Sequence, residues 1–286
     1  MAITNFIPTI WSETLYSELN KNFVAVNHCN RDFEGEIKSK GSVVNICGVG
    51  DITIKDYTAN TDMTNPQELD DSVTKLEINR AKFFNFQIDD VNKAQASPKL
   101  MEAAMRKAAE AIANEADSYV FSLYSQAGKT IVSKSSDDTT LFETILEARQ
   151  YLYENNVGDN VELFLEVSPS VAATILRSKA NLPYLNTDVI ENGYLGSIFG
   201  CKIYVCNNVN VNGSMHNCIL RTKRAITFAD QLSEVEAYRP EKRFADAVKG
   251  LHLYGAKVVY PQEMVCISYQ VSSAEQEPGG GDEIPE

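Results

Sequence analysis

The chain has 286 residues, of which 44% are hydrophobic and 23% charged, the composition of an ordinary globular protein. Acidic residues number 39 and basic residues 26, so the formal net charge is -13. This acidity argues against a body that wraps nucleic acid, because phosphate binding needs clustered Lys and Arg. The sequence predicts no signal peptide, and no apolar run approaches the ~20 residues that cross a bilayer. We therefore expect the protein to be made and kept in the cytoplasm, with no membrane partner.

The first 40 residues are predicted to form an N-terminal arm. It contains an apolar stretch, Asn5–Trp11, with the only tryptophan of the chain. Ser12 is a suitable cap for a short helix that runs to Lys21. Such an arm either docks on its own domain or reaches a neighbouring subunit.

Residues 41–90 are predicted to form an extended hairpin. Strands are expected over Val43–Ile46, Ile52–Ile54 and Val73–Ile88, and apolar and polar residues alternate in the last of these. The polar connector 58–71 is long for a link inside a compact domain. An isolated hairpin buries too little apolar surface to be stable in water. The hairpin is therefore expected to pack on another molecule.

A long helix is predicted from Ser97 to Ala127, within residues 91–137. Ser97 is a good N-cap and Pro98 suits the first helical position. Apolar residues at spacings of three and four predict one buried face. At a rise of 1.5 Å per residue, this helix would be about 45 Å long. It would therefore span a small domain.

Residues 138–219 are predicted to form an α/β subdomain. A helix is expected to begin at the capping box Thr140–Glu143 and to end at Asn155–Gly158. Strand Val161–Val167, helix Ser168–Ser178 and strand Cys201–Cys206 are expected to follow. This alternation favours one compact α/β unit.

Strands dominate the remainder of the chain up to residue 271. They are predicted to form one sheet, on which the long helix lies. The strands expected are Cys218–Leu220, Ala225–Phe228, Val235–Tyr238, Phe244–Leu253, Ala256–Tyr260 and Met264–Val271. Residues 272–286 contain five acidic and no basic residues, so they predict a disordered acidic tail.

No pattern in the sequence indicates catalysis, a cofactor or a metal site. The glycines at 48 and 50 lack the remainder of either nucleotide-binding fingerprint. The three histidines are far apart, and the adjacent acidic pairs are typical of solvated turns. The six cysteines lack C-x-x-C spacing and are expected to be free thiols. A metal site formed by Cys201, Cys206, His216 and Cys218 is disfavoured, because strand residues five apart face opposite sides.

Five local stretches resemble the major capsid proteins of tailed bacteriophages. Within that group they are similar to the coat family typified by the short-tailed lambdoid phage of Salmonella. The stretches are NFIPTIW (5–11), RDFEGEIK (31–38), GDITIKDY (50–57), FFNFQIDDVNKAQ (83–95) and YRPEKRFADAVKGLHLY (238–254). The Salmonella phage coat carries an additional inserted domain for which this chain has no room.

The resemblance implies an α+β shell fold that consists of a peripheral domain, an axial domain and an extended loop. Residues 91–137 and 220–271 would form the peripheral domain, residues 138–219 the axial domain, and residues 41–90 the extended loop over a neighbouring subunit. Copies would form the hexamers and pentamers of an icosahedral virion capsid around double-stranded DNA, without sequence-specific binding. A scaffolding protein and a portal protein are the further partners that the resemblance implies.

Seven residues are candidates for contacts between subunits: Trp11, Arg31, Asp56, Tyr57, Arg239, Lys242 and Arg243. The basic residues would form ion pairs across the interface; alternatively, they are solvated or paired within one subunit. Three rival functions are a bacterial nanocompartment shell of the same fold, an α/β enzyme with 138–219 as a ligand domain, and an adhesin or surface-layer subunit.

Overall fold

A computed structural model describes the arrangement of most of the chain. The described residues are 15, 17–33, 42–49, 54, 56, 71–89, 99–133, 138–158, 160–178, 194–242 and 244–271. Residues 17–22 are helical, and the helices with defined bounds are η1 (Val26–His28), α3 (Lys99–Ser122), η3 (Leu123–Gln126), α4 (Asp138–Glu154), α5 (Pro169–Ser178) and η5 (Pro261–Glu263). The strands are β1 (Val43–Val49), β2 (Asp71–Glu77), β3 (Arg80–Asp89), β4 (Lys129–Val132), β5 (Leu163–Val167), β6 (Tyr194–Ile198), β7 (Cys201–Val205), β8 (Val211–Asn212), β9 (Met215–Thr222), β10 (Ile226–Tyr238), β11 (Ala245–Val258) and β12 (Met264–Gln270).

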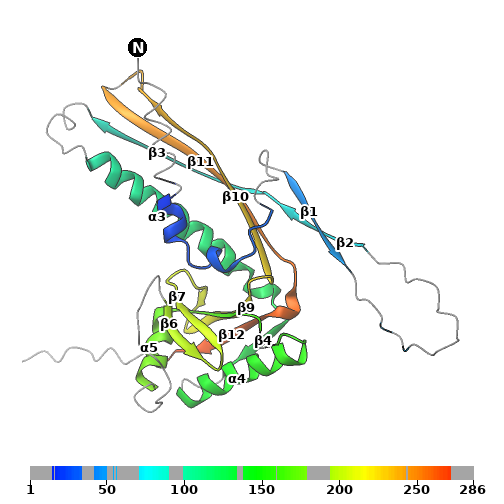
Figure 1. Cartoon of the computed structure of the whole chain (residues 1–286). Helices are drawn as coiled ribbons and strands as arrows, with labels where there is room; N and C mark the ends of the chain where they lie inside the picture. The colour runs from blue at the N-terminus through cyan, green and yellow to red at the C-terminus, as the bar shows by residue number, and fades with distance from the viewer. Residues whose placement is uncertain are drawn as a thin grey trace, which may run out of the picture.

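An elongated unit consists of α3 and a three-stranded antiparallel sheet in the order β10-β11-β3 (Figure 1). Side chains alternate between the two faces of a strand. Phe84 and Phe86 of β3 accordingly face α3 and pack against a core that includes Met105, Ile112 and Phe228. The opposite face of the sheet carries Phe83, whose side chain is 78% exposed. The helix therefore covers only one face of this sheet.

A compact unit lies at one end of α3 (Figure 1). Its mixed sheet has the order β4-β12-β9-β5-β7-β6, and β8 pairs with β9. A separate apolar core joins this sheet to α4 and α5, with Leu141, Ile145 and Leu152 on the buried face of α4. Asn156 has a positive φ of 62° just after α4, in agreement with the predicted helix end.

The hairpin of β1 and β2 projects from the side of the elongated unit (Figure 1). Its base is anchored by Val44, Ile46, Leu76 and Ile78, which pack with apolar residues of β10 and β11. The tip beyond this base lies largely outside the described residues, and the side chain of Ile54 is 93% exposed. The structure thus gives the hairpin a small core of its own at the base.

The structure corrects the predicted strand Val73–Ile88. That run is divided at Ile78 and Asn79 into β2, which pairs with β1, and β3, which pairs with β11. Apolar and polar residues alternate on both sides of the break, because β2 and β3 each bury only one face. Local periodicity therefore did not reveal the change of partner.

The single sheet predicted for residues 218–271 is also wrong. β10 and β11 belong to the three-stranded sheet, whereas β9 and β12 belong to the mixed sheet of the compact unit. The mixed sheet also includes β4, so it takes strands from both sides of the range 138–219. The predicted long helix is confirmed as α3 followed by the tighter turn η3. The division into peripheral and axial domains at residues 138 and 219 stays a prediction.

Gly255 lies in the middle of β11, where the strand passes very close to the hairpin. A Cβ atom at this position would overlap the carbonyl oxygen of Glu77. Gly255→Ala is therefore expected to lower the free energy of unfolding by about 1–3 kcal/mol, because the backbone must shift. Chemical denaturation of the full chain measures this loss. Gly158→Ala is the control, since nothing lies within 4 Å of a Cβ there; equal losses for both variants would contradict the prediction.

Candidate functional site: a buried junction and an open sheet face

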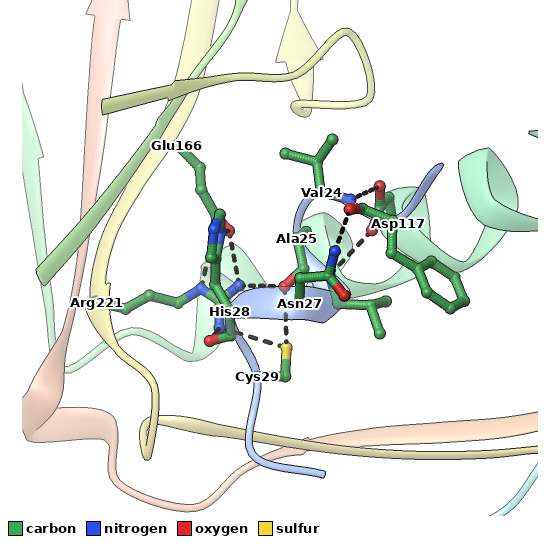
Figure 2. A network of polar contacts seen from close by, with 10 residues as sticks. Val24, Ala25, Asn27, His28, Cys29, Asp117, Glu166 and Arg221 are labelled. Carbon is green, nitrogen blue, oxygen red and sulfur yellow. Dashed lines mark hydrogen bonds and ion pairs between the residues drawn. The ribbon is translucent and has the colours of Figure 1, made fainter. Parts of the chain in front are cut away.

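The short segment 24–30, here called the junction segment, connects the elongated unit with the compact unit. Asn30 bonds with β10, since its N–H donates to the carbonyl of Ile226 and its carbonyl accepts from the N–H of Phe228, both at 2.9 Å. On its other side, the segment contacts α3, β5 and β9 through charged side chains (Figure 2). These side chains are Asp117, Glu166 and Arg221, which together with His28 are named the buried junction.

Arg221 of β9 is fully buried and donates to both oxygens of Glu166 on β5. The Arg221 Nε–Glu166 Oε2 distance is 3.0 Å and the Nη2–Oε1 distance is 2.8 Å. The same guanidinium donates to the carbonyls of Ala25 and His28, at 2.8 and 2.7 Å. Planar, bidentate pairing of this kind is the strong form of a charge-assisted hydrogen bond. Arg221 thus binds the junction segment to the mixed sheet.

Glu166 has a second partner in His28, whose Nδ1 lies 3.0 Å from Glu166 Oε1. The imidazole ring stacks on Phe164, with ring centroids 4.4 Å apart, and also contacts Tyr204. Burial acts to raise the pKa of Glu166, but the Arg221 charge and the His28 hydrogen bond outweigh it, so the pKa is lowered. Glu166 is therefore held as a carboxylate.

Asp117 approaches the junction segment from α3. Its two oxygens accept the backbone N–H groups of Val24 and Val26, at 2.9 and 3.0 Å. Burial raises the pKa of Asp117 to about 7, although these hydrogen bonds act in the opposite direction. The N–H groups of the segment therefore face an acidic side chain, and its carbonyls face a guanidinium (Figure 2).

This cluster was not predicted from the sequence. Its only signal was a charged residue inside an otherwise buried strand, Glu166 in Leu163–Val167 and Arg221 in Met215–Thr222. Lys, Glu, Arg and Asp are almost never fully buried unless they are paired. Two such residues in separate buried strands could have indicated a buried ion pair.

The second feature is the open face of the three-stranded sheet. A groove of about 350 Å³ lies there, lined by residues of β3, β10 and β11 that include Phe83, Glu236 and Leu251. On the opposite face, which α3 covers, Phe84 packs over Gly250, where any Cβ would meet the phenyl ring. Phe83 is 78% exposed, and Leu251, its partner on β11, is 38% exposed. Clusters of such residues on a surface indicate interaction sites.

The structure places the predicted contact residues in different settings. Arg31 pairs with the buried Asp230 of its own chain at 3.2 Å, and His252 contacts the other oxygen of that carboxylate at 2.9 Å. Three of the predicted residues are exposed, namely Asp56, Arg239 and Lys242. The remaining three, Trp11, Tyr57 and Arg243, lie outside the described residues. The role of all seven in contacts between subunits stays a prediction.

The described part of the chain holds no group of three or more His, Cys, Asp or Glu residues placed to bind a metal ion. Of the disfavoured metal set, His216 instead contacts Ser168 at 2.7 Å. The cysteines whose side chains are described are free and buried, as expected. Among the described helices, none is long and apolar enough to span a membrane.

Comparison with solved structures shows the fold. The chain is similar to a structure from Mycobacterium phage Che8, with 29% identity, a TM-score of 0.68, and coverage of 86% of this chain and 90% of that one. It is also similar to the capsid of Ralstonia phage GP4, with 11% identity, a TM-score of 0.66, and coverage of 90% and 92%. The encapsulin complex from Synechococcus elongatus matches with 12% identity and a TM-score of 0.59, over 84% of this chain and 85% of that one. The predicted α+β shell fold is therefore confirmed.

Sequence comparison shows the family. None of the curated proteins matches the chain. The family model described as phage capsid protein matches residues 73–267, which is more than half of the chain. The finer resemblance to the coat of the short-tailed Salmonella phage stays a prediction. The chain belongs to the phage capsid protein family.

Proposed function

We propose that this protein is the major capsid protein of a tailed phage, and that its copies form the hexamers and pentamers of an icosahedral head around double-stranded DNA. The observation that carries this proposal is the match of the phage capsid family model over residues 73–267. The 29% identity to the Che8 structure over most of both chains supports it. The role is structural, without catalysis or a cofactor.

The shape of the subunit supports assembly through extended contacts. The hairpin of β1 and β2 reaches away from the rest of the chain (Figure 1), and the open sheet face exposes Phe83 beside a groove. Burial of these surfaces against neighbouring copies would remove apolar area from water, at about 25 cal/mol per Å². Many such contacts of modest strength allow errors to be corrected while the shell closes.

The net charge of -13 supports a shell that does not hold the genome tightly. Like charges repel both other subunits and phosphates, so assembly would need an offsetting partner or geometry. We assign the role of the offsetting partner to a scaffolding protein that acts during assembly in the host cytoplasm. A portal protein would form the vertex through which DNA enters. The final location is the virion capsid.

A nanocompartment shell is the alternative function, favoured by the fold match to the Synechococcus encapsulin complex. That match has 12% identity and therefore concerns the fold alone. Co-purification distinguishes the two functions. A phage head would package DNA with portal and scaffolding proteins, whereas a nanocompartment would enclose an enzyme.

Negative-stain microscopy and sedimentation of the full chain, with and without a co-expressed scaffolding candidate, test the proposal. We expect closed shells or capsomer-sized rings. Phe83→Asp should reduce these assemblies at least tenfold and leave the thermal midpoint of the subunit unchanged, because the exposed ring makes few contacts within its own chain. Leu146→Asp, at an exposed position of α4 in the compact unit, is the matched control. A monomer under every salt and concentration tested would contradict the proposal.

A further inference from the structure

The buried junction contains more acidic than basic charge. Asp117 and Glu166 carry two negative charges when both are ionised, and Arg221 carries one positive charge. All three side chains are fully buried, and His28 is only 7% exposed. Arg221 is bonded to Glu166 and so balances that carboxylate, whereas the side-chain contacts of Asp117 are with backbone N–H groups. Burial of an unbalanced charge is costly, so one added proton would stabilise the cluster.

The position of that proton follows from the hydrogen bonds. Glu166 is neutralised by the bidentate contact with Arg221 and is also bonded to His28. Asp117 instead bonds to the backbone N–H groups of Val24 and Val26, which are neutral donors. Of the two carboxyl groups, Asp117 therefore gains more from protonation.

Two thiols near Asp117 do not compete for this proton in the neutral range. Cys29 of the junction segment and Cys206 after β7 face the cluster, and burial raises the pKa of these thiols to about 11 and about 12. Both therefore stay neutral. The Glu166 carboxylate on β5 acts to raise the pKa of Asp117 further, since like charges repel.

We propose that the buried junction is a proton-linked latch, in which protonation of Asp117 secures the junction segment between the elongated and compact units. The latch is a property of the folded subunit. It does not rest on the proposed function.

The direction of the pH dependence follows from the two carboxyl groups. The folded pKa of Asp117, about 7, lies above its ordinary value of 3.8, so its contribution favours the closed latch at low pH and is lost as the pH rises through about 7. The pKa of Glu166 is lowered from 4.5, so its contribution is present above pH 4.5 and is lost as the pH falls below it. The closed latch is therefore most stable near the ordinary pKa values of 3.8 and 4.5, weakens as the pH rises from there, and has lost the Asp117 contribution above about pH 7.

Hydrogen exchange of the full chain, measured by mass spectrometry and corrected for intrinsic exchange rates, tests the latch. Protection of the amides in 24–30 should fall about tenfold between pH 6 and 8.5, because the equilibrium changes about tenfold per pH unit below the folded pKa of about 7 and levels off above it. Peptides from α4 serve as the internal reference and should change less than threefold. A change below threefold in 24–30 would overturn the proposal.

Two variants identify the group that binds the proton. Asp117→Asn should remove the pH step, whereas His28→Gln should keep it, since glutamine can still donate to Glu166. If His28→Gln removes the step, or Asp117→Asn retains it, the assignment is wrong. If Asp117→Asn does not fold, the wild-type chain and His28→Gln are compared instead. A fall in protection with rising pH in both chains supports the proposal, and its absence from either one overturns it. Shell formation is not read in this experiment, so its outcome is independent of the proposed function.

Discussion

Arg221→Met is expected to lower the free energy of unfolding by about 3–5 kcal/mol, because it leaves Glu166 as a buried carboxylate without its cation. The carbonyls of Ala25 and His28 would also lose their donor. Methionine has a similar length and an apolar side chain, so the loss reports on charge and hydrogen bonding more than on volume. Chemical denaturation at pH 7 measures this loss.

Lys202→Met is the matched control for Arg221→Met. Lys202 pairs with Glu162 at 2.6 Å, but the two side chains are 41% and 65% exposed. An exposed pair of this kind contributes at most about 1 kcal/mol. A double variant, Arg221→Met with Glu166→Leu, should recover part of the loss, because no unpaired charge stays buried. Equal losses for Arg221→Met and Lys202→Met would disprove a central role for the buried pair.

Leu76→Ala is expected to cost about 2–5 kcal/mol, because it leaves a cavity in the small core at the base of the hairpin. Leu76 is fully buried there between β2 and the three-stranded sheet. Limited proteolysis should detect earlier cleavage of the hairpin, and denaturation should report the total loss. Under the proposed function, the looser hairpin would also reduce shell yield.

Val43→Ala on the neighbouring strand is the control for Leu76→Ala. Val43 is 49% exposed, so its truncation should change stability by less than about 0.5 kcal/mol. If both variants have the same effect, the hairpin is not anchored by the small core at its base.

The sequence predicted the type of most elements correctly. The strand-like run Val43–Ile46 and the caps around α4 are local signals, which depend on residues only a few positions apart. Gly255 shows where such signals mislead. Two strands, Phe244–Leu253 and Ala256–Tyr260, were predicted here, but β11 continues through Gly255, because the glycine permits close passage of the Glu77 backbone.

Strand partners were the part that sequence reasoning could not supply. Residues 80–89 show the alternation of a hairpin strand whether they pair with β1 or with β11. Likewise, the apolar pattern of Met264–Gln270 fits either sheet, and the structure places it between β4 and β9. Which sheet a strand joins depends on the apolar surface buried across the whole fold. A short stretch of sequence carries no information on that burial.

By itself, the sequence determined the element types, the long helix and, through five short motifs, the resemblance to phage capsid proteins. The tertiary structure decided which strands share a sheet and brought Arg221 to the carbonyl of His28, a residue 193 positions away. The physical reason is that periodicity and capping are set by neighbours along the chain. A buried charge cluster exists only where separate elements exclude water together, and that exclusion is a property of the folded whole.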